Sequence, residues 1–127
     1  MKKLFLKSLF FISLSILFCS CIESGMQNSE PRYRLFETQN FWTFIQLDTA
    51  TGKMWQLQYV IEGDNRGGVV LNEIDLSNEI KQTSGRFTLY PTQNMYNFIL
   101  LDQIDGRSWQ VQWSIEPENR GIVPIMQ

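Results

Sequence analysis

The sequence has no histidine, and its only two cysteines, Cys19 and Cys21, lie close together near the N-terminus. The remaining chain therefore lacks the nitrogen and sulfur ligands of a typical zinc site and cannot form a disulfide framework. It also lacks an imidazole base and a thiol nucleophile for catalysis. We expect no metal, no cofactor and no enzymatic activity.

Long hydrophobic runs are also scarce. The clearest one, Ser8–Phe18, follows three lysines at positions 2, 3 and 7. A positive start and a short apolar centre are typical of a secretory signal peptide, and the run is too short for a membrane-spanning helix. An uncleaved transmembrane anchor is the alternative.

The segment Phe18-Cys19-Ser20-Cys21 resembles the lipobox of bacterial lipoproteins. In that family the last cysteine is the site of lipid attachment and becomes residue one after cleavage. The resemblance implies that residues 1–20 are removed and that Cys21 carries acyl chains such as palmitate, two or three in all, because one chain holds a protein only marginally. It also implies export to the bacterial cell envelope, where we expect the outer membrane. A strained disulfide between Cys19 and Cys21 is the alternative.

A basic surface is missing as well. Without residues 1–20 the chain keeps 8 Lys and Arg against 13 Asp and Glu, a net charge of −5. Nucleic acids and anionic lipid surfaces both select basic proteins. We therefore expect no nucleic-acid partner, and membrane contact through the lipid alone.

What the sequence does contain is a duplication. Residues 32–73 align with residues 86–127 at a constant offset of 54 without a gap, and 19 of the 42 aligned pairs are identical. Unrelated segments match at roughly one position in fifteen. The predicted organisation is a tether over 21–31 and one domain over 32–127, in which residues 74–85 link repeat 1 (32–73) to repeat 2 (86–127).

Each repeat is predicted to be a three-to-four-stranded antiparallel meander, which makes the domain all-β. The strands are expected near 32–36, 41–48, 55–61 and 68–72, and near 86–90, 95–102, 109–115 and 122–126, with the fourth strand of each repeat at an edge. The polar linker is expected to be a loop with at most one helical turn.

The third strand of each repeat has a period-two pattern. It places Trp55, Leu57, Tyr59 and Ile61 on one face, and Trp109, Val111, Trp113 and Ile115 on the equivalent face. We expect these two faces to be core, with the glutamines between them exposed. The repeats would then cover each other about a pseudo-twofold axis, as one small barrel or sandwich and as a monomer. The alternative is a pair of propeller blades that oligomerisation completes.

A shared hairpin joins the second and third strands. It reads Asp48-Thr-Ala-Thr-Gly52-Lys in repeat 1 and Asp102-Gln-Ile-Asp-Gly106-Arg in repeat 2. Glycine predicts a positive φ, and the first aspartate can accept bonds from loop amides. The motif L-D-x-x-x-G-[KR]-x-W resembles the hairpin of quinoprotein-type β-propeller blades, which implies this turn only. A calcium site at Asp102 and Asp105 is the alternative to turn capping.

Six residues are candidates for ligand binding. Arg66 and Arg120 occupy equivalent Asn-Arg-Gly loops, where they either hold an acidic ligand group or form a local ion pair that fixes the loop. Trp42 and Tyr96 are candidate surface aromatics, and Gln58 and Gln112 add side-chain amides of the kind that bind sugars.

These features favour a non-catalytic binding or accessory lipoprotein of the cell envelope, with a glycan or protein ligand. A structural, inhibitory or immunity partner of another envelope protein is the second hypothesis. A carboxylate-dependent hydrolase is the third, because the carboxylates lie mostly in turns and the spacing of a catalytic pair is a spatial property.

Overall fold

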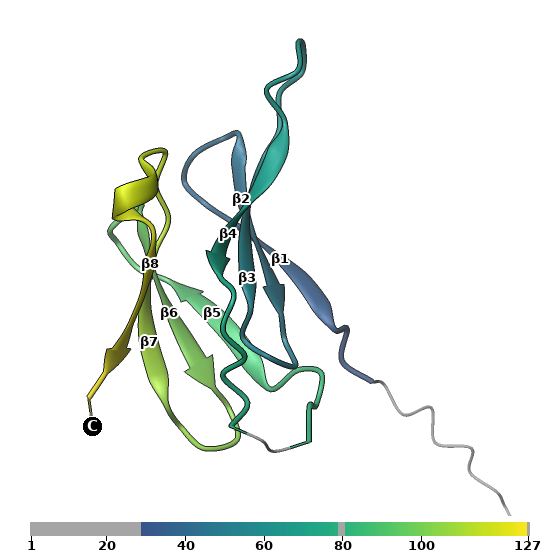
Figure 1. The fold of residues 1–127 in the computed structure, drawn as a ribbon, viewed down its shortest axis with the longest axis vertical. Helices are drawn as coiled ribbons and strands as arrows, with labels where there is room; N and C mark the ends of the chain where they lie inside the picture. Colours follow the sequence, from purple (N-terminus) through teal and green to yellow (C-terminus); the bar gives the residue numbers. More distant parts are fainter. Residues whose placement is uncertain (1–28, 79–80, 127) are drawn as a thin grey trace, which may run out of the picture.

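The computed structural model describes residues 29–78 and 81–126, and this part of the chain is all-β (Figure 1). Each repeat forms one four-stranded antiparallel meander, in the orders β1-β2-β3-β4 and β5-β6-β7-β8, and the two sheets stack without closing into a barrel. The strands are β1 (Tyr33–Glu37), β2 (Thr43–Asp48), β3 (Met54–Gln58), β4 (Gly67–Asn72), β5 (Phe87–Pro91), β6 (Asn97–Asp102), β7 (Ser108–Gln112) and β8 (Gly121–Ile125). The all-β prediction and the sandwich are confirmed. A 3-10 turn, η1 (Pro117–Asn119), was not expected from the sequence.

The N-terminal predictions lie outside the described residues. They are the signal peptide, the lipid attachment at Cys21 and all but the last residues of the tether. Within the ranges that the structure covers, no helix is long and apolar enough to span a membrane.

Side-chain capping explains why the shared Thr-Gln-Asn segments turn. Thr38 Oγ1 donates to the carbonyl of Thr43 at 2.7 Å, and Asn40 Oδ1 accepts from the Trp42 amide at 2.9 Å. Thr92 and Asn94 repeat both contacts in the second copy. These bonds join residues two to five positions apart, so the turn is encoded locally and the prediction is confirmed.

The β2–β3 and β6–β7 hairpins close as the sequence predicts. Gly52 and Gly106 have φ of +78° and +81°. Their amides donate to the carbonyls of Asp48 and Asp102, respectively, at 2.9 Å each. The aspartate side chains accept the amides of Ala50 and Ile104 at 3.0 Å each.

Substitution of the two hairpin glycines should destabilise the protein unequally. Gly106→Val should cost on the order of 1–3 kcal/mol through backbone strain alone, because a Cβ there would meet no heavy atom within 4 Å. Gly52→Val should cost more, because its Cβ would lie 2.9 Å from Leu76 Cδ1. Thermal unfolding measures both, and Gly67→Val is the control because Gly67 lies in a strand with open space around it. Equal melting temperatures for all three variants would contradict the hairpin geometry.

The two repeats bury opposite faces of the same strand pattern. In repeat 2 the core face carries Phe98, Leu100, Trp109, Val111 and Trp113. The prediction is confirmed for Trp109, Val111 and Trp113 but is wrong for Ile115, which lies beyond the end of β7 and is 69% exposed. In repeat 1 the residues equivalent to these point away from the core, and the neighbouring residues Ile45, Leu47, Met54 and Gln56 are buried instead.

The core prediction is therefore wrong for repeat 1. Trp55 and Leu57 are only partly buried, Tyr59 is 43% exposed, and Ile61 is 80% exposed. The physical reason is that β2 is apolar on both sides, so either face of the first sheet can pack against a neighbour. Periodicity defines the two faces of a strand but does not select the buried one.

We call the face with Phe44, Trp55 and Leu57, and its equivalent in repeat 2, the front face. The opposite one, with Ile45, Leu47 and Gln56, is the back face. The front face of repeat 2 packs on the back face of repeat 1, so the sheets stack in the same orientation and not about a twofold axis. Strands β4 and β8, which are equivalent, lie next to each other in this stack (Figure 1).

Polar contacts fix the stack at both ends. The side-chain amide of Gln56 donates to the carbonyl of Ser114 at 3.1 Å and accepts from its N–H at 3.2 Å. At the other end the Phe87 amide donates to the Thr49 carbonyl at 2.8 Å, and the Leu76 amide donates to the Thr51 carbonyl at 2.7 Å. The linker has no helix in its described part, and Leu76 joins the core.

Candidate functional site

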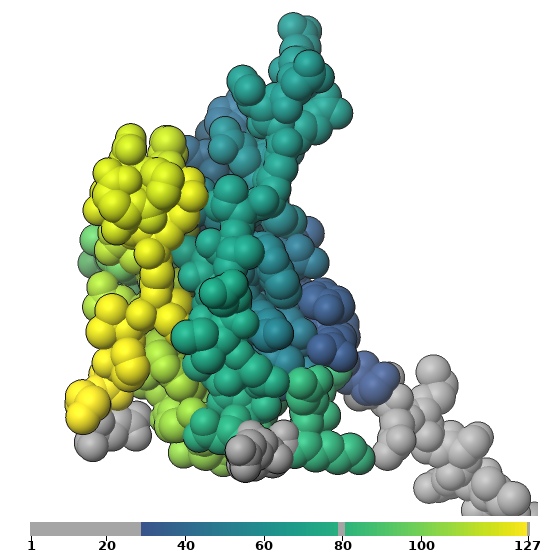
Figure 2. Space-filling model, in the orientation of Figure 1, coloured from purple at the N-terminus to yellow at the C-terminus, as the bar shows by residue number. Residues whose placement is uncertain are grey.

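The predicted binding residues are spread over three places. Gln58, Arg66 and Arg120 line a polar cleft of about 350 Å³ together with Gln56 and Asn65. This cleft lies at the end of the molecule where the β3–β4 and β7–β8 loops stand side by side (Figure 2). Both glutamines of β3 and both predicted arginines thus line the same cleft, although Arg120 belongs to the other repeat.

Both arginines hold their own loops. Arg120 Nε donates to the carbonyl of Ser114 at 2.6 Å, and its Nη2 donates to that of Ile115 at 2.8 Å. Arg66 Nη2 donates to the carbonyl of Gly63 at 2.8 Å. The loop-fixing interpretation therefore describes them, but the acceptors are main-chain carbonyls and not carboxylates. Arg66 keeps an exposed guanidinium at the rim of the cleft.

Tyr96 and Gln112 lie in a second hollow, of about 420 Å³, beside Ser114 and Glu116. The Tyr96 ring packs on Trp113 at 5.1 Å between centroids, and Trp113 Nε1 donates to the carbonyl of Met95 at 2.8 Å. This ring is therefore fixed by the core beneath it. It remains 42% exposed, as expected for a surface aromatic.

Trp42 belongs to the third place, the front face of repeat 1. Its ring meets that of Tyr59 edge-on at 5.4 Å, and Tyr59 in turn lies 6.0 Å from Phe44. At the other end of the same face Tyr33 lies 6.5 Å from Trp55. The aromatic rings therefore follow one another across β1, β2 and β3 on a surface that no other element of the described chain covers.

Sequence reasoning missed this front face as a candidate site. Besides the rings it carries Leu35, 61% exposed, Val70, 52% exposed, and the partly buried Leu57. The signal for it was the second strand, which is apolar on both faces. Soluble monomers rarely expose a contiguous apolar patch of this kind without a partner.

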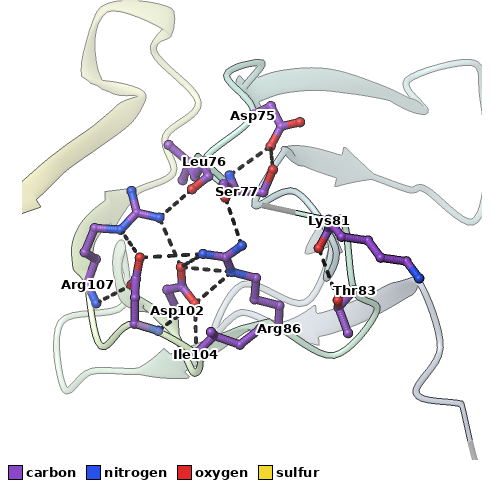
Figure 3. Close-up of polar contacts among 10 residues, drawn as sticks. Asp75, Leu76, Ser77, Lys81, Thr83, Arg86, Asp102, Ile104 and Arg107 are labelled. Atoms are coloured by element: carbon purple, nitrogen blue, oxygen red, sulfur yellow. Dashed lines mark hydrogen bonds and ion pairs between the residues drawn. The ribbon is translucent and has the colours of Figure 1, made fainter. Parts of the chain in front are cut away.

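The strongest electrostatic feature is a buried ion pair between Arg86 and Asp102 (Figure 3). It lies at the end of the sheets opposite to the cleft at Gln58. Arg86 Nη2 lies 2.7 Å from Asp102 Oδ2, and both side chains are fully buried. Arg107 Nη2 lies 3.0 Å from the same oxygen. Linker carbonyls complete the site, since Ser77 O accepts from Arg86 at 2.9 Å and Leu76 O accepts from Arg107 at 2.6 Å.

The pKa of Asp102 reflects this environment. Burial opposes its ionisation, but the bonds from Arg86 and from the amides of Ile104 and Asp105 outweigh burial and lower the pKa to about 2. Asp102 is thus ionised in the folded protein at neutral pH. With Arg86 and Arg107 both bound to it, Asp102 is the anionic centre of an ion-pair network that joins the β6–β7 hairpin to the start of β5.

The calcium alternative finds no support at this loop. Asp102 and Asp105 both face arginines, with Asp105 Oδ2 2.6 Å from Arg107 Nε. Over the part of the chain that the structure covers, no three His, Cys, Asp or Glu side chains gather as metal ligands. Turn capping accounts for both carboxylates.

Comparison with known proteins places this chain beside none of them. No protein-family model matches the sequence, and neither a curated protein nor a solved structure matches it significantly.

Proposed function

We propose that this protein is an exported, lipid-anchored and non-catalytic binding module, and that the front face of repeat 1 is its recognition surface. The observation that carries the proposal is the exposed apolar face formed by Tyr33, Leu35, Trp55, Leu57 and Val70. Burial of such a face against a partner releases ordered water and stabilises the complex in proportion to the apolar area removed from water.

A protein partner suits this face better than a glycan. Sugar-binding platforms combine one or two exposed rings with polar side chains that bind hydroxyl groups. Here Gln46 is the only amide side chain among the front-face residues of β1, β2 and β3, while Leu35, Leu57 and Val70 offer aliphatic surface. The amide-rich cleft at Gln58 is the better place for a glycan, but no exposed aromatic ring lines it.

Photo-crosslinking in living cells tests the surface. A photoreactive amino acid at Leu35 should give a protein adduct, because this side chain lies on the front face and is 61% exposed. The matched control is Ile104, whose exposure of 55% is close to the 61% of Leu35, but which lies in the β6–β7 loop. Equal adduct yields at both positions, or no protein adduct at Leu35, would contradict the proposed surface.

Lipid anchoring is a separate part of the proposal and has its own test. Cys21→Ser should move the protein from the membrane fraction to the soluble fraction, because Cys21 is the proposed attachment point in the lipobox-like segment. Fractionation and intact mass measure the change, and Cys19→Ser is the control that should remain on the membrane. A Cys21→Ser protein that stays membrane-bound at full precursor mass would identify the segment as an uncleaved anchor.

A further inference from the structure

We propose that the partner of the front face is a second copy of this chain, which presents the back face of its repeat 2. This inference rests on the proposed function and names the occupant of the same surface. The front face of repeat 1 in one chain would then pack on the back face of repeat 2 in the next chain. Within one chain, the front face of repeat 2 packs on the back face of repeat 1 in the same way.

The two free faces of the molecule are copies of the two faces that meet inside it. The buried front face of repeat 2 contains Phe87, Leu89, Phe98, Trp109 and Val111. The free front face of repeat 1 carries Tyr33, Leu35, Phe44, Trp55 and Leu57 at the equivalent positions. Each residue keeps its aromatic or aliphatic character, and the main difference is Gln46 in place of Leu100.

The back faces correspond equally well. Repeat 1 buries Ile45, Leu47, Gln56 and Leu71 in the internal contact. Repeat 2 presents Ile99, Leu101, Gln110 and Ile125 at the same positions on its outer side, next to Val123, which is 64% exposed. The free back face of repeat 2 therefore carries nearly the same side chains as the back face of repeat 1, on which the front face of repeat 2 packs. The main difference is Ser108 in place of Met54.

The polar clamp of the internal contact also has an equivalent pair. Inside the chain, the Gln56 amide binds the N–H and C=O of Ser114. The equivalent residues are Gln110, which is exposed, and Val60. Within the described ranges Val60 makes no hydrogen bond, so its main chain is free to accept the Gln110 amide of another copy.

The symmetry of this contact follows from the use of opposite faces. Each copy has one free front face and one free back face, so the contact is heterologous. Association therefore continues from chain to chain until a ring closes, or else extends as an open stack. The sequence predicts a monomer on the assumption that the front faces of the two repeats cover each other. In the structure the front face of repeat 2 covers the back face of repeat 1, so one front face and one back face stay free.

Cysteine crosslinking on the full-length lipoprotein in its own membrane tests the contact directly. The variant Val60→Cys with Gln110→Cys should be joined between chains by a short bismaleimide, giving a ladder of dimers and larger products. The matched control is Gln56→Cys with Ser114→Cys, whose partners meet within one chain. This variant should add one crosslinker to the monomer mass and give no dimer. Each single variant should give no dimer, because a heterologous contact needs both positions.

Three results would overturn the proposal. The control pair could link while Val60→Cys with Gln110→Cys gives monomer only. A single variant alone could give a dimer, which would indicate a twofold contact. The photoreactive residue at Leu35 could capture only a different protein, in which case the proposed function stands and self-association fails. If Leu35 gives no protein adduct at all, both the proposed function and the proposed self-association are wrong.

A mixing experiment checks the direction of stacking with variants that leave the core intact. Leu35→Glu places a charge on the free front face, and Val123→Glu places one on the free back face; both side chains are mostly exposed. Each variant alone should run as a monomer in detergent. A mixture should form dimers and no larger species, because only one intact front face and one intact back face remain to meet. Unchanged assembly of either variant alone would contradict the model.

Discussion

Arg86→Ala should lower the free energy of unfolding by about 3–5 kcal/mol, because it leaves the buried Asp102 carboxylate without its main partner. Arg86 and Asp102 are both fully buried, and their guanidinium and carboxylate groups lie 2.7 Å apart. Removal of one partner from a buried pair costs far more than the pair itself contributes, since Arg107 and the loop amides that remain on Asp102 replace only part of the lost bonds. Chemical denaturation of the purified protein measures the loss.

The duplication supplies a matched control for this prediction. Arg32 and Asp48 are the equivalent pair in repeat 1, and their side chains lie 3.1 Å apart, but Arg32 is 49% exposed. Water and salt screen this pair, so Arg32→Ala should cause a much smaller loss. Equal losses for the two variants would show that burial of the second pair under the linker has no energetic consequence.

The pH dependence of stability gives a second measurement on the same pair. The pKa of Asp102 falls from 3.8 to about 2 in the folded chain, so its ionised form stabilises the fold. This contribution, about 2 kcal/mol, is complete above the unfolded pKa and is lost as the pH falls from about 4 to about 2. Asp102→Asn should remove this part of the acid dependence, and Asp48→Asn is the control.

Trp113→Ala should destabilise the protein by about 3–5 kcal/mol, as expected for loss of a large side chain from a close-packed core. Trp113 is 1% exposed, whereas Tyr59, its equivalent in repeat 1, lies on the free front face. Tyr59→Ala should therefore cost the isolated chain much less. Unfolding in urea at protein concentrations low enough to separate the copies measures both.

The back faces predict the reverse order. Leu47 is fully buried under repeat 2, and Leu47→Ala should cost about 2–5 kcal/mol. Leu101 holds the equivalent position on the outer back face and is only partly buried, so Leu101→Ala should cost less. Large effects at Trp113 and Leu47 with small effects at Tyr59 and Leu101 are specific to stacking in one orientation. Equal effects within each equivalent pair would indicate the twofold arrangement instead.

The candidate site was predicted only in part, for a physical reason. Arg66, Arg120 and Gln58 meet in one cleft because the β3–β4 and β7–β8 loops stand at the same end of the stack, which the packing of the two sheets decides. Trp42 and Tyr96 are exposed as predicted, yet they occupy separate surfaces. The front face around Trp55 was assigned to the core, because the alternation in β3 is the same as in β7, where that face is buried.

The sequence by itself determined the local structure of this protein. Glycine at positions 52 and 106, the Thr-Gln-Asn turns and the period-two alternation act over two to five residues, so they define the strands, the hairpins and the duplicated meander. Tertiary structure alone decided which face each sheet buries. It also decided whether the arginine that precedes the first strand of each repeat is buried. Arg32 and Arg86 are equivalent residues just before the first strand of each repeat, but only Arg86 is buried and bound by a linker carbonyl, that of Ser77. A strand with two apolar faces can pack on either side, and only the neighbouring sheet determines which side that is.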